Sequence, residues 1–474
     1  MFIVNKRRLY LLLGPVLFLL CCFCLPQSVF TTFESRAAIG TMAWTAFWWI
    51  TAPVDYAVTG LLPIAINAVI PMAPMSGVIS NYASETIMLL LGADIITVSW
   101  EETGLDKRIA AKFLGLIGNN LKQQVLFWFL LSAGLSAILP NAVVCATITA
   151  IAMAMLNYIG HGDIPNSRIG SKLLLTIAYA AGLGGIASPL GGAMNLVVVD
   201  YIQQITGKEF MYTTWVIRFL PITLALVIIN IFFLTRDVKA EENLGGSKEY
   251  FALEARKMPP MSFEEKCSLG LFIIATILAF TRQLYQAYLP GLKPAYAFII
   301  CAIISFLITG KGGDRLMLWK SVQTKVIWEM LYIFGGGLAI GTIVSQSGAA
   351  QAIGDAVANM GLTGGLFTVF VIVTVTLLMS DVTSNTATAA ISIPIVISII
   401  NGIGLNPIPY IYIASIGINL SYMLPTSIRA IPVGYGLSPK YMLSEGWKMS
   451  IVIIVSMTAI SYVLLKFWPA FSLA

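Results

Sequence analysis

Charged residues are scarce in this chain: Asp, Glu, Lys and Arg make up 11% of its 474 residues, against roughly 25% in soluble domains. Hydrophobic residues make up 58%. Apolar runs close to the ~20 residues that cross a bilayer recur along the chain, for example Leu9 to Leu25, Trp215 to Leu234 and Ile451 to Leu465. Only the segment Arg236 to Lys266 leaves room for a soluble region. The composition excludes a soluble globular protein and predicts an all-α polytopic membrane protein.

Histidine is nearly absent, and the six cysteines have no metal-ligand or disulfide spacing. Three of the cysteines, Cys21, Cys22 and Cys24, crowd into the first apolar run, where we expect them to pack as small apolar residues. The single histidine, His161, lies in a polar loop segment and cannot form a metal cluster by itself. No paired-acid or His-rich constellation suited to acid/base or metal-assisted catalysis is visible. The sequence therefore argues against an enzyme.

The net charge of +6 is explained by membrane topology, because Lys and Arg in short loops favour the cytoplasmic side. With the N-terminus in the cytoplasm, 21 of the 28 Lys and Arg residues fall inside and five fall outside. The other two are Arg429, deep in an apolar helix, and Lys466. We therefore expect a multi-pass protein of the cell membrane with a cytoplasmic N-terminus. The lipid bilayer is its expected surrounding, and no nucleic-acid partner is expected.

The hydropathy pattern predicts eleven spanning segments plus two re-entrant helical hairpins that enter and leave on one side. The predicted divisions are an N-terminal helix in 1–37, a first repeat at 38–235, a cytoplasmic linker at 236–266 and a second repeat at 267–474. The first repeat contains a hairpin at 121–158 and a broken helix at 172–201; the second contains a hairpin at 364–403 and a broken helix at 408–435. Other helices are expected near 9–25, 38–52, 56–72, 86–102, 213–235, 267–284, 295–309, 326–346 and 448–468.

Each predicted hairpin has a tip with polar residues. The second, Met379 to Thr388, is a dense polar run in an apolar segment; the first, Leu139 to Thr147, is a degraded copy of it. Their asparagines, Asn141 and Asn385, are 385 − 141 = 244 positions apart. In the predicted topology the hairpins open to opposite sides, so the repeats are inverted. Inverted repeats are typical of secondary transporters, which bind substrate near the midplane.

The spacing supports a true repeat. Gly92 precedes Asn141 by 49 positions, and Gly335 precedes Asn385 by 50. A cluster of helix breakers follows each tip, at 182–192 and at 425–434. One such cluster often only eases packing or a kink, but two in corresponding places indicate unwound backbone that can bind ions or anions.

Five motifs in order resemble the divalent anion:sodium symporter family of dicarboxylate and citrate carriers. They are Val58 to Pro63, Gly104 to Ala110, Gly335 to Gly337, Ser384 to Thr386 and Met423 to Pro425. The resemblance covers almost all of the chain after the first helix. It implies a homodimer with a fixed scaffold and an elevator-type transport domain.

When the family's roles are carried over by position, the resemblance implies that Asn141, Asn385 and Thr386 hold the substrate carboxylates. The candidate substrate residues also include neighbours of these three and residues of the second break. The full substrate set is Asn141, Ala142, Ser384, Asn385, Thr386, Ser427, Ile428 and Arg429. The cation positions, or their substitutes, are Ser136, Pro140, Gly191, Ser380, Thr383 and Arg429. No cofactor is expected except sodium, which a symport mechanism would require.

The chain departs from the family at two places. The first tip reads Pro140, Asn141, Ala142 where the family has Ser-Asn-Thr, so a hydroxyl is lost on each side of the asparagine; a sodium site there becomes doubtful. Arg429 stands where the second sodium is expected. A buried arginine needs an anionic partner, either a dicarboxylate or, alternatively, Asp381 in a structural salt bridge.

A fixed arginine in place of sodium favours exchange, because an empty carrier would keep a buried positive charge. We therefore expect an antiporter of C4/C5 dicarboxylates such as succinate, malate, fumarate or 2-oxoglutarate. Sodium-coupled dicarboxylate or citrate symport is the alternative, and a membrane-embedded enzyme or an anion channel is less favoured. Asp94, in a long apolar segment, is interpreted as a hydrogen-bonded packing residue, with a proton relay as the alternative.

Overall fold

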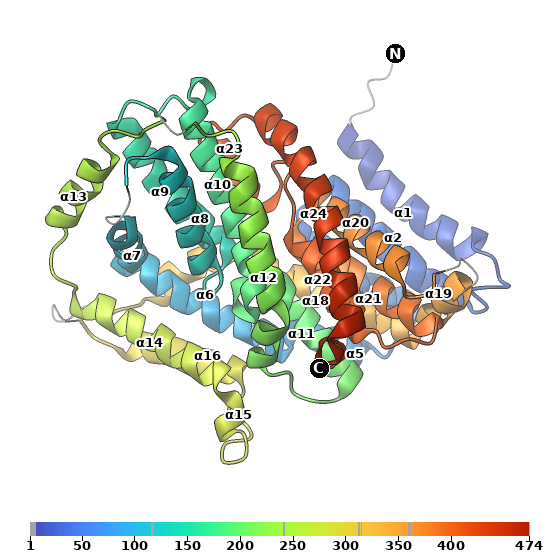
Figure 1. Cartoon of the computed structure of the whole chain (residues 1–474). Helices are drawn as coiled ribbons and strands as arrows, with labels where there is room; N and C mark the ends of the chain where they lie inside the picture. Colours follow the sequence, from blue (N-terminus) through green and yellow to red (C-terminus); the bar gives the residue numbers. More distant parts are fainter. Residues whose placement is uncertain are drawn as a thin grey trace.

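The computed structural model describes residues 6–114, 118–239, 242–310, 313, 315–358 and 362–473. These residues form helices and connecting loops, and within them strand pairing is limited to two isolated bridges. Eight helices of the described residues are long and apolar enough to cross a membrane, and four shorter ones are also apolar. The prediction of an all-α polytopic membrane protein is confirmed. Figure 1 shows α1 (Lys6–Cys24) at one end of the molecule and α13 (Ser247–Lys257) at the other.

The first half of the chain continues from α1 to the end of α12. Its helices are α2 (Phe33–Thr51), α3 (Tyr56–Gly60), α4 (Leu62–Val69), α5 (Met75–Ser80), α6 (Glu85–Thr103), α7 (Leu105–Leu114), α8 (Leu121–Ser136), α9 (Asn141–Tyr158), α10 (Arg168–Gly184), α11 (Ala193–Thr206) and α12 (Tyr212–Thr235). Two short 3-10 turns, η3 (Gly185–Ala187) and η4 (Pro189–Gly191), separate α10 from α11.

The second half follows the linker helix α13. Its helices are α14 (Phe263–Phe280), α15 (Arg282–Tyr285), α16 (Pro294–Leu307), α17 (Trp319–Lys325), α18 (Trp328–Gln346), α19 (Ala349–Ala358), α20 (Leu366–Val382), α21 (Asn385–Gly402), α22 (Ile408–Asn419), α23 (Ala430–Gly434) and α24 (Pro439–Phe467). The 3-10 turn η5 (Ser427–Arg429) precedes α23.

Most predicted segments match a helix to within a few residues, with three differences of detail. The segment expected as one helix at 56–72 is divided into α3 and α4, with Pro63 at the second residue of α4. The segment expected at 267–284 is α14 followed by the separate turn α15. The last helix begins at Pro439 rather than near residue 448, because Ser438 caps it and proline is well tolerated in a first turn.

The same order of elements occurs in both halves. A long helix (α6, α18) is followed by a shorter one (α7, α19), a hairpin (α8–α9, α20–α21), an interrupted helix (α10–α11, α22–α23) and another long helix (α12, α24). Each hairpin packs its first helix on the first part of the interrupted helix, α8 on α10 and α20 on α22. The interrupted helices also meet each other: α10 packs against η5 and α23, and α11 against α22. This crossing brings the two chain breaks together, with Gly185 of the first and Arg429 of the second buried.

Candidate functional site

The second hairpin tip is shaped by hydrogen bonds of its own hydroxyl groups. Ser384 caps α21, because its side chain accepts the backbone N–H of Ala387 at 3.1 Å. Thr383 and Thr388 share a hydroxyl–hydroxyl hydrogen bond of 2.8 Å across the turn. The cap and this bond place Asn385 at the first position of α21, at the apex of a rigid turn.

Hairpin tip 2 is fastened to the second interrupted helix. The Ser380 hydroxyl lies 2.7 Å from the Ile418 carbonyl oxygen and 2.9 Å from Asn385 Oδ1, two acceptors that share its single proton. Asp381 Oδ1 accepts the backbone N–H groups of Tyr422 and Met423, each at 2.8 Å. The carboxylate therefore satisfies two amides that the broken helix leaves without helical partners. Asn385 Nδ2 is buried and has no hydrogen-bond partner among the described residues.

Arg429 lies at the second break and is 1% exposed. Its Nη1 donates to the Ser421 carbonyl at 3.0 Å, while Nε and Nη2 have no partner within the described part of the chain. Asp381 attracts Arg429 electrostatically, but the ion pairs within 4.0 Å among described residues do not include these two side chains. The Ser421 hydroxyl in turn donates to Asn385 Oδ1 at 3.4 Å. Arg429 and Asn385 thus both bond to Ser421, and both side chains keep N–H groups without a partner among the described residues.

The two predicted substrate residues that precede Arg429 in the chain do not share its unused donors and have different surroundings. Ser427 is exposed and has a φ of 51°, a left-handed conformation that is uncommon for a residue with a side chain. Ile428 is buried, and its carbonyl accepts Cys145 Sγ of the first hairpin at 3.5 Å. The sequence brings these residues to the break, but Ile428 packs against the first hairpin.

The first hairpin tip is fastened to the first break in the same way. The Ser136 hydroxyl donates to the Ala181 carbonyl at 2.6 Å, and the Ser188 hydroxyl donates to the Ala137 carbonyl. Gly191 has to be glycine, because a Cβ there would lie 2.5 Å from the Gly185 carbonyl oxygen and 2.6 Å from that of Ser136. The predicted cation residues Ser136 and Gly191 therefore lie close together, with the Ser136 hydroxyl already engaged.

Sequence reasoning missed Asn195, which holds the first break closed. Its Nδ2 donates to the carbonyls of Gly185 at 2.6 Å and Ser188 at 2.9 Å, and its Oδ1 accepts from Asn419 Nδ2 at 2.9 Å. Asn419 ends α22, so this pair joins the two interrupted helices. The signal in the sequence was an asparagine three residues after Gly192, in an apolar run.

The two breaks can be aligned by their equivalent hydrogen bonds, and the alignment shows where the two halves differ in charge. Thr426 donates to the Asp381 carbonyl at 2.9 Å, as Ser188 does to Ala137, so the breaks correspond with an offset of 426 − 188 = 238. The same offset places Arg429 opposite Gly191, since 191 + 238 = 429. The two acceptor carbonyls, those of Ala137 and Asp381, correspond at the offset of the hairpin tips, 381 − 137 = 244. The second half therefore carries an acid and a base where the first half carries two small neutral residues.

A cavity of about 50 Å³ lies where hairpin tip 1 faces α6 and the start of α18. Pro140, Asn141 and Ala142 line it, together with Asp94 of α6 and Met330 of α18. Tip 2 reaches the same methionine, because the Thr386 hydroxyl lies 3.9 Å from Met330 Sδ. The two polar tips thus approach one place, as expected for a shared site. The cavity has room for a water molecule or two and is too small for a dicarboxylate in this conformation.

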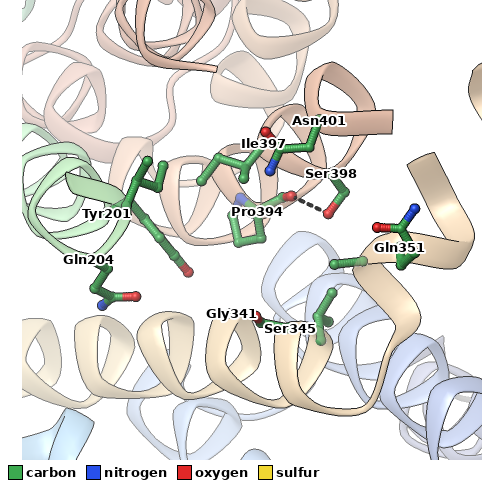
Figure 2. Close-up of a pocket in the computed structure, with 12 residues that line it drawn as sticks. Tyr201, Gln204, Gly341, Ser345, Gln351, Pro394, Ile397, Ser398 and Asn401 are labelled. Carbon is green, nitrogen blue, oxygen red and sulfur yellow. Dashed lines mark hydrogen bonds between the residues drawn. The ribbon is translucent and has the colours of Figure 1, made fainter. Parts of the chain in front are cut away.

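A larger cavity of about 350 Å³ lies between α11, α18, α19 and α21. Figure 2 shows Tyr201 and Gln204 facing α18, with Ser398 bonded to the Pro394 carbonyl on the other side. Its lining contains amides, hydroxyls and apolar groups but no charged side chain. It offers nothing to neutralise a dianion.

An all-helical membrane protein with two polar hairpin tips packed on two interrupted helices has the architecture of a secondary transporter. A family model described as citrate transporter matches residues 46–417. The chain belongs to this family of transporters, which confirms the resemblance inferred from the motifs and the expectation of transport rather than catalysis.

Curated relatives cover nearly the whole chain. The sodium-dependent dicarboxylate transporter SdcS of Staphylococcus saprophyticus is 27% identical over 96% of this chain and 90% of the relative. The protein of the same name from Staphylococcus aureus is 28% identical over the same shares. Among solved structures, the YdaH transporter of Alcanivorax borkumensis matches with a TM-score of 0.54 and 12% identity, covering 83% of this chain and 89% of that one. The likeness to YdaH concerns the fold alone.

Proposed function

We propose that this protein exchanges C4/C5 dicarboxylates across the cell membrane, without sodium at the second break. The observation that carries the proposal is the place of Arg429. Its guanidinium donates to a carbonyl of the broken helix, at the position that corresponds to Gly191 in the other half. A fixed positive charge there does what a bound cation does in a symporter. The relatives named as dicarboxylate transporters support the substrate class.

Exchange follows from the unused donors. Arg429 Nε, Arg429 Nη2 and Asn385 Nδ2 are buried without partners, and each such group costs about 1–3 kcal/mol. A carboxylate can accept from all of them, and arginine presents its donors in a fork that fits a carboxylate. A transport domain that crosses empty keeps this cost, whereas one that crosses loaded does not. Counter-substrate therefore accelerates the return step.

The motion and assembly belong to the same proposal. We propose two inverted repeats, an elevator motion of the two hairpins and interrupted helices against a scaffold, a homodimer and a cytoplasmic N-terminus. The repeated order of elements and the crossed packing of α10–α11 with α22–α23 support the inversion. The distribution of Lys and Arg supports the orientation. The hairpin tips would carry the substrate between the two sides.

Transport in proteoliposomes tests the exchange. Vesicles loaded with unlabelled succinate or left empty receive external labelled succinate, with sodium or choline as the external cation. We expect uptake only into loaded vesicles and equal rates in both salts. Arg429→Lys, which keeps the charge but loses the fork, is expected to retain slower exchange. Strong sodium-driven uptake into empty vesicles would show that the proposal is wrong.

Sodium-coupled dicarboxylate symport is the second candidate, and the printed name of both relatives favours it. The hydroxyl-rich tip around Ser380 and Thr383 could still offer oxygen ligands to one ion. Under this candidate, sodium accelerates uptake into empty vesicles, so the same experiment separates the two.

A further inference from the structure

The cavity beside hairpin tip 1 has two polar side chains, which come from different elements. Asn141 belongs to the tip, and Asp94 belongs to α6. The other side chains that line it are apolar or small. An asparagine amide can donate to a carboxylate, and the carboxyl oxygens of an aspartate can accept a hydrogen bond.

Asp94 is held as an acceptor. The backbone N–H of Ile327, just before α18, donates to its carboxylate, which leaves further lone pairs toward the cavity. Glu101, another acid, is the charged residue that interacts electrostatically with Asp94. The nearby cation Lys325 pairs instead with Glu101 at 3.8 Å and Glu102 at 2.8 Å. Within the described residues, the remaining acceptor capacity of Asp94 therefore faces a cavity whose lining is apolar or small apart from Asn141.

The chemistry of this lining selects the substrate group that fits it. Asp94 presents carboxyl oxygens that can accept a hydrogen bond. A methylene group would leave the carboxylate lone pairs without a donor in apolar surroundings. A hydroxyl group can donate, and the cavity of about 50 Å³ has room for one or two water-sized groups.

We propose that Asp94 accepts a hydrogen bond from the hydroxyl of a 2-hydroxy dicarboxylate whose carboxylate is held at Asn141. Asp94 is then a specificity-determining residue that favours malate-type acids over succinate. This inference rests on the proposed dicarboxylate transport. The remainder of the substrate extends toward tip 2, where Thr386 meets Met330.

Binding of L-malate and succinate to the purified full-length protein, measured by titration calorimetry, tests the inference. The two acids differ by one hydroxyl group. One hydrogen bond corresponds to a preference of about twofold to tenfold, so we expect wild type to bind malate tighter by that factor. Asp94→Leu should bring the preference close to one. Asp94→Asn keeps a carbonyl acceptor of the same shape and should keep part of the preference.

The matched control is Asp200→Asn in α11. Asp200 accepts from Thr86 at 3.3 Å and Gln204 at 2.6 Å and does not line this cavity, so its variant should keep the wild-type preference. Equal affinities in wild type, or a wild-type preference that persists in folded Asp94→Leu, would overturn the inference. So would tighter binding of L-aspartate than malate, which would make Asp94 a counter-ion to an ammonium group. If wild type binds none of these acids, the proposed transport function itself fails.

Discussion

Replacing Arg429 by serine is the most direct test of a fixed charge in place of sodium. The substitution removes the donor to the Ser421 carbonyl, and an unpaired buried carbonyl costs about 1–3 kcal/mol. It also removes the positive charge that attracts Asp381. The space and the oxygen atoms then become available to a cation. We expect a less stable protein that has gained a response to sodium.

The size of that response can be worked out. A site half-saturated near 10 mM sodium would gain about 1.4 kcal/mol at 100 mM, from mass action on the folded state. For domains of 150–250 residues, 1 kcal/mol corresponds to about 2–4 °C in melting temperature. The assay is thermal unfolding of detergent-purified protein in 100 mM sodium chloride against 100 mM choline chloride, at constant ionic strength.

Wild type should melt at the same temperature in both salts, and Arg429→Ser should melt a few degrees higher in sodium. Arg429→Lys is the matched control, because it keeps the positive charge and should stay indifferent to the cation. Two results would refute the reasoning. Sodium could stabilise wild type as much as the serine variant, or it could fail to stabilise the serine variant although that variant folds.

Three further changes have definite outcomes. Gly191→Ala places a Cβ within 2.6 Å of two carbonyl oxygens, so the break must shift and we expect transport to be lost in a protein that still inserts, measured by vesicle uptake and size-exclusion chromatography. Asn195→Ala removes the link to Asn419 and should lower the melting temperature by several degrees, since buried hydrogen-bond networks contribute about 1–3 kcal/mol when one partner is removed. For Asp237, burial alone would raise the pKa, but the hydrogen bond and charge of Lys172 lower it overall. Its stabilisation is therefore present above about pH 4 and is lost as the pH falls further, and Asp237→Asn should flatten the melting-temperature profile between pH 5 and 3.

Much of this architecture could be predicted from the sequence, for physical reasons. Spanning helices need long apolar runs, so their positions are visible in composition. The breaks were visible because Gly and Pro interrupt hydrogen-bonded helix in both halves. Short helices such as α7 and α19 were not predicted, because their length and mixed polarity give no comparable signal.

The polar contacts of the candidate site were less predictable, because they join residues far apart in the chain. The bond from Asn195 to Asn419 spans 224 positions, and one sequence without relatives does not show such a pair. The sequence identified Asp94 as an unusual intramembrane acid, which we interpreted as a packing residue. That interpretation did not predict that Asp94 lines a cavity with Asn141. Asp381 was considered a partner of Arg429, whereas its Oδ1 accepts two backbone amides.

The two halves share a framework but differ in charge, and this difference bears on how coupling changes within one architecture. Ser136 and Ser380 make the same hydroxyl-to-carbonyl bond to their interrupted helices, so the two hairpins are fastened alike. The halves differ at the position three residues after the hydroxyl residue of each break, which is Gly191 in the first half and Arg429 in the second. Because hydroxyl groups and backbone hold the break, the proposed exchange mechanism needs a charged side chain at this position and not a different fold. Under that proposal, coupling depends on Arg429 and on the hydroxyl groups that Pro140 and Ala142 do not supply at the first tip.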